Sequence, residues 1–148
     1  EYTLTGGLPD IIDMPKLKIL ELSDTGITGP LSEMKTPELL QFQANNCTLE
    51  SLHSSIWELP KIEFIGIQLG ESKKPFPLKG ELPKDFSRCA TLQALAIGGC
   101  PNFVGEIPAS IAKCTQMQQL LLQNGHIGTI PKELGTMKNL VLLALANN

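Results

Sequence analysis

The fold is decided by one short segment, Leu92-x-x-Leu95-x-Ile97, because the chain repeats its spacing of apolar residues six times. The copies are Leu17-x-x-Leu20-x-Leu22, Pro37-x-x-Leu40-x-Phe42, Ile62-x-x-Ile65-x-Ile67, Leu92-x-x-Leu95-x-Ile97, Met117-x-x-Leu120-x-Leu122 and Leu140-x-x-Leu143-x-Leu145. We call the three apolar residues of each copy its anchors. The last anchors, at positions 22, 42, 67, 97, 122 and 145, lie 20, 25, 30, 25 and 23 residues apart. Self-similarity at a period of roughly 20 to 50 residues is typical of solenoids and other stacked repeats.

A second element recurs between these segments and reads L-x-G-x-I-P. Its copies are Leu4-Thr5-Gly6-Gly7-Leu8-Pro9, Ile27-Thr28-Gly29-Pro30-Leu31, Leu78-Lys79-Gly80-Glu81-Leu82-Pro83, Phe103-Val104-Gly105-Glu106-Ile107-Pro108 and a shortened Ile127-Gly128-Thr129-Ile130-Pro131. After the proline, apolar residues follow at intervals of three, as in Ile111, Cys114 and Met117. This interval favours a 3-10 segment, whereas the alternation of the first element favours a strand with one buried face.

The two elements together resemble the leucine-rich repeat family, and specifically its plant-type L-x-G-x-I-P subclass. Similar repeats occur in receptor-like kinase ectodomains, polygalacturonase inhibitors and bacterial surface proteins. The resemblance implies an α/β fold, a right-handed leucine-rich-repeat solenoid (horseshoe), with a parallel β-sheet on the concave side and 3-10 or irregular segments on the convex side. It covers residues 1–148, so we expect a single domain of about six repeats whose two ends lie within repeats.

The sequence departs from the family pattern at the ladder position, three residues after the last anchor of each copy. The residues there are Thr25, Asn45, Gly70, Cys100, Gly125 and Asn148, so only two of the six are the expected asparagine. We therefore expect a patchy ladder of side-chain amides.

Composition excludes several classes of protein. By count 24 residues are leucine and 13 are isoleucine, while charged residues make up 18% of the chain, which is typical of a folded protein and not of a disordered one. No apolar run reaches the ~20 residues that a bilayer crossing needs, so we expect no membrane insertion. The net charge is −3 and Arg88 is the only arginine, which makes nucleic acid an unexpected partner.

Residues that alternate with the buried leucines should face the concave surface. We expect the ligand-binding side chains there, and they are Ile19, Glu21, Leu39, Gln41, Gln43, Phe64, Gln68, Gln119, Leu121, Gln123 and Leu142. A neutral surface rich in glutamine and apolar residues suits a protein, a peptide or a neutral glycan. The same composition is also explained if small, neutral residues merely fit a tightly curved sheet.

An insertion between Ile67 and Leu78 accounts for the longest step between copies. It carries two lysines and a phenylalanine between prolines, so Lys73, Lys74 and Phe76 form a possible contact loop. The alternative is a tolerated surface insertion in which Phe76 packs against the core.

No catalytic or metal-binding pattern is found. The spacings of Cys89, Cys100 and Cys114 match no zinc motif, and each cysteine fills a structural position of the repeat, with Cys47 in an aliphatic one. We expect four reduced thiols, mostly buried, and no cofactor. His53 and His126 lie where the chain turns, at surface positions without a catalytic partner.

Asn46-Cys47-Thr48 forms an N-x-T sequon, so Asn46 is a possible glycosylation site in a secreted protein. The resemblance implies a non-catalytic recognition module, extracellular or on the cell surface, that binds a protein or peptide through its concave face. The alternative is a structural segment that packs against further repeats or a second copy. The apolar strand near Val141 makes self-association through the C-terminal edge possible.

Overall fold

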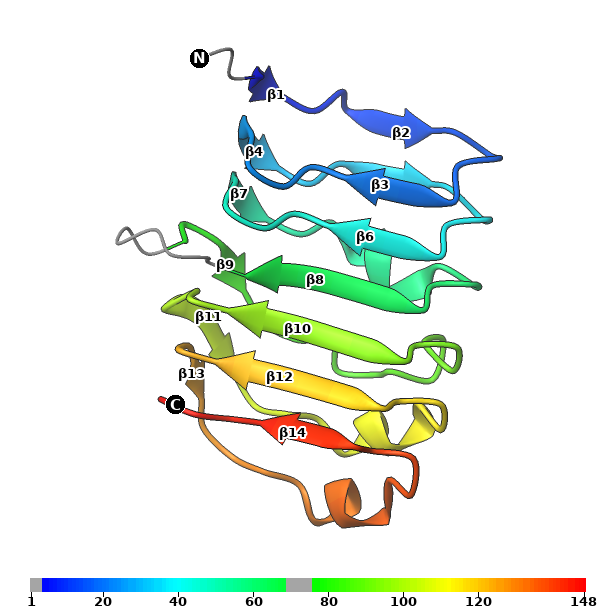
Figure 1. Ribbon diagram of the computed structural model, residues 1–148, viewed down its shortest axis with the longest axis vertical. Helices are drawn as coiled ribbons and strands as arrows, with labels where there is room; N and C mark the ends of the chain where they lie inside the picture. Colours follow the sequence, from blue (N-terminus) through cyan, green and yellow to red (C-terminus); the bar gives the residue numbers. More distant parts are fainter. Residues whose placement is uncertain (1–3, 69–75) are drawn as a thin grey trace.

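The computed structural model of the protein describes residues 4–68 and 76–148. Its main feature is a six-stranded parallel sheet in the order β14-β12-β10-β8-β6-β3, so each turn of the chain adds one strand beside the last (Figure 1). The strands are β3 (Ile19–Glu21), β6 (Gln41–Gln43), β8 (Phe64–Gln68), β10 (Ala94–Gly98), β12 (Gln119–Gln123) and β14 (Leu142–Ala144). The architecture is therefore a solenoid, as the repeat predicts.

Two smaller parallel sheets form a second side of the solenoid. One contains β1 (Thr5–Gly7), β4 (Gly26–Pro30) and β7 (Thr48–Ser51), and the other contains β9 (Lys79–Gly80), β11 (Asn102–Gly105) and β13 (His126–Ile127). The glycines of the L-x-G segments lie in β1, β4, β9 and β11, and Gly29, Gly80 and Gly105 have φ of 87°, 129° and 113°. Glycine is required there because side chains rarely tolerate such φ values.

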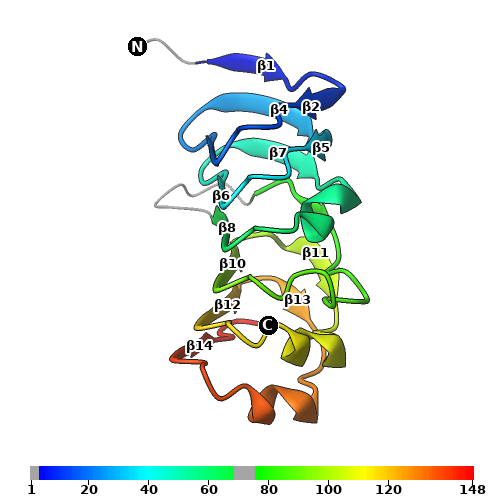
Figure 2. The same cartoon turned by 90° about the vertical axis from the view of Figure 1, so that its right-hand side faces the viewer.

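The side opposite the main sheet changes along the solenoid. Three coils have the expected 3-10 helices, η1 (Ser54–Glu58), η2 (Ala109–Lys113) and η3 (Lys132–Thr136), whereas the first two have the strands β2 (Ile11–Asp13) and β5 (Glu33–Lys35) (Figure 2). Chain length explains the difference. Met117 comes nine positions after Pro108, whereas Leu17 comes eight positions after Pro9. A shorter segment crosses the same width only by extending, since a strand rises ~3.3 Å per residue and a 3-10 helix ~2.0 Å.

In the second repeat, the strand register differs from the alignment predicted from the sequence. Phe42 pairs with Leu20 on one side and with Ile65 on the other, so the anchors of this copy are Leu39, Phe42 and Ala44. Leu39 and Ala44 are both fully buried, and the expectation that Leu39 faces the concave surface is wrong. The adjacent leucines at 39 and 40 allow two alignments of the sequence, which differ by two residues. Such a shift preserves the alternation, so Gln41 and Gln43 remain on the outer face of the sheet.

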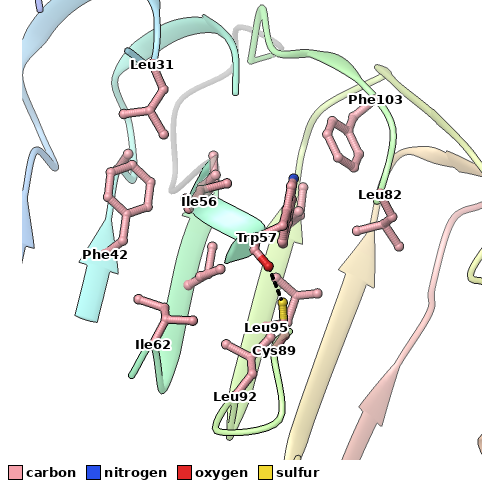
Figure 3. Close-up of a cluster of buried hydrophobic side chains, with 14 of the residues drawn as sticks. Leu31, Phe42, Ile56, Trp57, Ile62, Leu82, Cys89, Leu92, Leu95 and Phe103 are labelled. Atoms are coloured by element: carbon pink, nitrogen blue, oxygen red, sulfur yellow. Dashed lines mark hydrogen bonds between the residues drawn. The ribbon is translucent and has the colours of Figure 1, made fainter. Parts of the chain in front are cut away.

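The core fills the space between the main sheet and the opposite side (Figure 3). Phe42, Ile56, Leu92 and Leu95 are fully buried. Trp57 on η1 packs edge-on against Phe86, with ring centroids 5.8 Å apart. Packing between coils therefore uses side chains from elements on both sides of the solenoid.

Phe76 belongs to this core and not to a contact loop. Its side chain is 1% exposed, and its backbone N–H donates to the carbonyl oxygen of Gly99 at 2.9 Å. The interpretation in which Phe76 packs against the core is therefore confirmed, and the alternative of an exposed contact residue is wrong for Phe76. Lys73 and Lys74 lie outside the described residues.

One corner of every coil repeats the same turn, in which the backbone carbonyl of a corner residue accepts the N–H three residues later. The corner residues are Met14, Thr36, Leu59, Cys89, Cys114 and Met137. Thr36 is 1% exposed, and its hydroxyl oxygen is the buried side-chain polar atom without a hydrogen-bond partner among the described residues. A polar group thus occupies a position that its neighbouring coils fill with sulfur-containing or aliphatic side chains.

Thr36→Val should increase the stability of the protein. The substitution replaces an unsatisfied buried hydroxyl by a methyl group, and we expect the free energy of unfolding to rise by about 1 kcal/mol. Thr91→Val is the matched control and should lower it, because the Thr91 hydroxyl donates to the carbonyl oxygen of Ile62 at 2.8 Å. Urea denaturation of both variants measures the two changes. A loss of stability in Thr36→Val would mean that the hydroxyl has a partner.

Candidate functional site

The outer face of the main sheet brings the predicted binding residues together. Strand register places Gln41 beside Ile19 and Phe64, and Leu121 beside Ala96 and Ala144. In the corrected register of the second repeat, Leu39 does not belong to this face and Asn45 does. The face consists of Ile19, Glu21, Ser23, Gln41, Gln43, Asn45, Phe64, Gly66, Gln68, Ala94, Ala96, Gly98, Gln119, Leu121, Gln123, Leu142, Ala144 and Ala146. Glu21 is the one charged residue in this set, so the surface remains neutral over most of its length.

The centre of this concave face has a floor of small residues. Gly66, Ala96 and Gly98 are buried although they lie on the outer side of their strands, because longer neighbours overhang them. A Cβ atom added at Gly66 would lie 2.7 Å from Cε1 of Phe64. The absence of that atom lets the Phe64 ring lie across Gly66, so an aromatic surface lies next to the floor.

A column of left-handed residues at the end of the strands was not expected from the sequence. Asp24, Asn46, Asn124 and Asn147 have φ between 51° and 58°. Asn46 Nδ2 donates to Asp24 Oδ1 at 2.9 Å, and Asn147 Nδ2 donates to Asn124 Oδ1 at 2.8 Å, so the column also links neighbouring coils. Asparagine and aspartate tolerate this conformation better than other non-glycine residues, and that preference is the signal that could have found the column.

The ladder position contains thiols and hydroxyls more than amides. Because the second repeat is shifted, its ladder residue is Cys47 and not Asn45, and Cys47 does not fill an aliphatic position. The side chains of Thr25, Cys47 and Cys100 donate to backbone carbonyls within their own turns. Asn148 donates to the carbonyl oxygens of Leu122 and Leu145, at 2.7 Å each. The expectation of a patchy amide ladder is therefore confirmed, with a different second member.

All four thiols are buried, as predicted. Burial raises the pKa of Cys89 to about 11 and the pKa values of Cys100 and Cys114 to about 12, and it also raises the pKa of Cys47. Cys89 Sγ additionally donates to the carbonyl oxygen of Trp57 at 3.0 Å (Figure 3). The thiolate is the nucleophilic form, so these side chains are structural and inert.

The thiols should react only in the unfolded chain. We expect iodoacetamide at pH 8 to leave the native protein unmodified and to alkylate four cysteines in denaturant, as measured by intact mass. The pKa of an unfolded thiol is near 9.0, whereas the pKa of folded Cys89 is about 11 and the pKa values of folded Cys100 and Cys114 are about 12. The thiols' contribution to stability should therefore be complete below pH 9.0 and should be lost as the pH rises towards 12. Rapid native alkylation would contradict this prediction.

The other candidate residues form no catalytic or metal-binding site among the residues that the structure describes. His53 is exposed and lies immediately before η1, where its Nδ1 accepts the backbone N–H of Ser55 at 3.2 Å. The side chain of His126 lies outside the described part. Within residues 4–68 and 76–148, no three histidine, cysteine or acidic side chains form a group that could hold a metal ion. Within the same ranges no helix has the length and apolar character that a membrane crossing requires.

The last coil exposes apolar side chains. Val141, Leu142 and Leu143 are 85%, 42% and 45% exposed. On the first strand of the main sheet Ile19 is 57% exposed. Both outer strands therefore present apolar surface.

Comparisons with known proteins concern the fold. The sequence matches no protein-family model and no curated protein. Among solved structures, the chain resembles the plant peptide hormone receptor RGFR1 in complex with RGF2, with a TM-score of 0.50 and 22% identity over 99% of this chain and 31% of that one. It also resembles the crystal structure of PEPR1-AtPEP1, with a TM-score of 0.50 and 21% identity over 97% of this chain and 27% of that one.

The chain spans less than a third of the length of either receptor chain. At this level of identity the likeness concerns architecture alone. Together with the repeat and the strand order, it shows the leucine-rich-repeat solenoid that the sequence predicts.

Proposed function

We propose that this protein is a non-catalytic recognition module that binds a protein or peptide through the concave face of its main sheet. The observation that carries the proposal is the rigid sheet that presents side chains from six coils on one neutral surface. A surface that is already ordered loses little conformational entropy when it binds, so more of the contact energy becomes affinity. The similar RGFR1 structure contains the hormone RGF2, which supports a peptide as the partner class.

The concave face is tested by placing a large side chain at its centre. A displayed library of short random peptides is selected on the wild-type protein, and the affinities of the selected peptides are then measured for two variants. Ala96→Arg should weaken binding by at least about tenfold, which corresponds to a loss of ~1.4 kcal/mol. Val104→Arg is the control, because Val104 lies on β11 outside the main sheet and is 44% exposed.

Both variants should keep the circular dichroism of the wild type, and the affinities are compared at a temperature at which both variants are folded. Peptides that bind the two variants equally would place the binding surface elsewhere. A library that yields no peptide specific for the protein would contradict the proposal as a whole.

The alternative is an assembly module, and the exposed apolar side chains of β14 favour it. In this case Val141, which directly precedes β14, and Leu142 pack against a second copy or a further repeat. Replacing both residues with lysine should convert a self-associating protein into a monomer with unchanged circular dichroism, as measured by size-exclusion chromatography with light scattering. If the unmodified protein is monomeric at high concentration, the assembly role through this edge is wrong.

We further propose the plant-type subclass, a single repeat domain, and an extracellular or cell-surface location. The support is the L-x-G-x-I-P element, whose glycines form the left-handed corners of the second side. Asn46 remains a candidate for glycosylation in such a location. It lies half-buried in the turn between β6 and β7, and its Nδ2 donates to Asp24. Mass spectrometry of the protein from a eukaryotic secretory host tests the modification directly.

A further inference from the structure

The same departure from regular strand pairing occurs just before successive strands of the main sheet. The carbonyl oxygen of Glu63 accepts two N–H groups of the next coil, from Gln93 at 2.8 Å and from Ala94 at 3.0 Å. The carbonyl oxygen of Gln93 likewise accepts the N–H groups of Gln118 and Gln119. Two residues therefore oppose one, as in a β-bulge, and a bulge redirects side chains next to a sheet.

The result is a hollow of about 180 Å³ on the concave side, at the N-terminal ends of β8, β10 and β12. Its lining consists of Glu63, Phe64, Gln93, Ala94, Gln118 and Gln119. Sequence reasoning missed Glu63, Gln93 and Gln118, because they come one residue before the alternating strand positions. The hollow is smaller than the ~300 to 1,000 Å³ of small-molecule sites, so its size suits one side chain of a larger partner.

The lining offers several hydrogen-bond acceptors. Glu63 supplies a carboxylate, and each glutamine supplies an amide oxygen. Ala94 forms a small floor beside Phe64. This combination suits a planar cation, because a guanidinium group donates up to five hydrogen bonds and can reach several acceptors at once.

Charge favours the same occupant. Glu63 is exposed, and none of the ion pairs among the described residues involves it, since these pairs join Lys61 to Glu38, Arg88 to Glu58, and Lys113 to Asp85. The position equivalent to Glu63 is Leu40 in the preceding coil and Lys18 in the coil before that, whereas Gln93 and Gln118 follow on the other side. The two nearest equivalent positions are therefore uncharged, and a cation from a partner would complement the carboxylate.

We propose that this hollow binds an arginine side chain of the peptide partner, with the guanidinium held by the Glu63 carboxylate and the amide oxygens of Gln93 and Gln118. The inference rests on the proposed function and specifies the chemistry of its ligand. Arginine fits better than lysine, because lysine presents a compact charge with three donors, whereas the planar guanidinium donates in several fixed directions.

The probes are peptides selected from the displayed library on the wild-type protein, each measured with its arginine and with citrulline, the uncharged isostere. We expect an arginine to be enriched at one position of the selected peptides. Replacing it with citrulline should weaken binding to the wild type by about tenfold, since a hydrogen bond between charged groups contributes ~1.5 to 3 kcal/mol. Lysine at that position should weaken binding by a smaller factor.

The protein variants make the test specific. Glu63→Gln should weaken the binding of the arginine peptide by about tenfold. It should also remove the difference in affinity between the arginine and the citrulline peptide, as expected for a direct charged contact. Glu106→Gln removes the same charge from an exposed residue outside the concave face and should change neither affinity. Both variants should melt at the wild-type temperature, because each affected carboxylate is exposed.

The outcomes separate this inference from the proposed function. If Ala96→Arg weakens the binding of the selected peptides but no arginine is enriched in them, the inference is wrong and concave-face binding still holds. A citrulline effect of equal size in the wild type and in Glu63→Gln would also overturn it. If the selection yields no binding peptide, both the proposed function and this inference are wrong.

Discussion

Leu120→Ala is expected to lower the free energy of unfolding by about 2 to 5 kcal/mol, the usual cost of removing a large side chain from a packed core. Leu120 on β12 is fully buried and lies between two strands of the main sheet, where it pairs with Leu95 and Leu143. The surrounding side chains belong to coils that are packed on both sides. They can therefore relax little around the cavity, which places the loss in the upper part of this range.

Leu143→Ala provides the matched control, because Leu143 occupies the same position of the repeat one coil further on. It is 45% exposed, so we expect a loss of about 1 kcal/mol, in proportion to the smaller area that it buries. Urea denaturation of both variants measures the difference. Equal losses would indicate that the last coil is covered, for example by a second copy, and would support the assembly role.

Phe76→Ala is expected to destabilise the protein by about 3 to 5 kcal/mol, the usual range for truncating a buried aromatic side chain. The side chain is 1% exposed, and the segment that carries it is tied to the next coil by the hydrogen bond from Phe76 N–H to Gly99. An exposed contact residue would behave in the opposite way and cost little on truncation. The measurement therefore decides between the two interpretations of the insertion.

Two controls sharpen this prediction. Phe76→Leu keeps an apolar side chain and should cost less than Phe76→Ala, because the remaining cavity is smaller. Val104→Ala removes a half-exposed apolar side chain and should change stability by less than about 1 kcal/mol. A loss of binding by Phe76→Ala without a loss of stability would restore the contact role.

Sequence spacing determined the solenoid, the main sheet and the buried positions of Leu95, Leu120 and Cys89. These follow from repetition, because one coil cannot bury its apolar face alone and an identical neighbour completes the burial. The L-x-G element likewise identified the corners, since side chains rarely tolerate the φ values of 87° to 129° found at Gly29, Gly80 and Gly105. Local rules were sufficient wherever the pattern was repeated without ambiguity.

The tertiary structure decided the remaining points. In the second repeat, Leu39 and Leu40 satisfied the spacing equally well, and only pairing of Phe42 with Leu20 and Ile65 selected the register. Phe76 stands between prolines in an insertion, where no periodicity indicates which way a side chain points. Its burial depends on the coil that follows it in space.

The hollow on the concave face also depended on the third dimension. Glu63, Gln93 and Gln118 occupy positions that strict alternation does not assign to the outer face, and the paired hydrogen bonds to one carbonyl group bring them there. Alternation is a property of single strands, so the sequence by itself determined the repeat and its buried face. The bulge is a property of neighbouring strands, and only the stacking of coils decided which polar side chains meet beside Phe64.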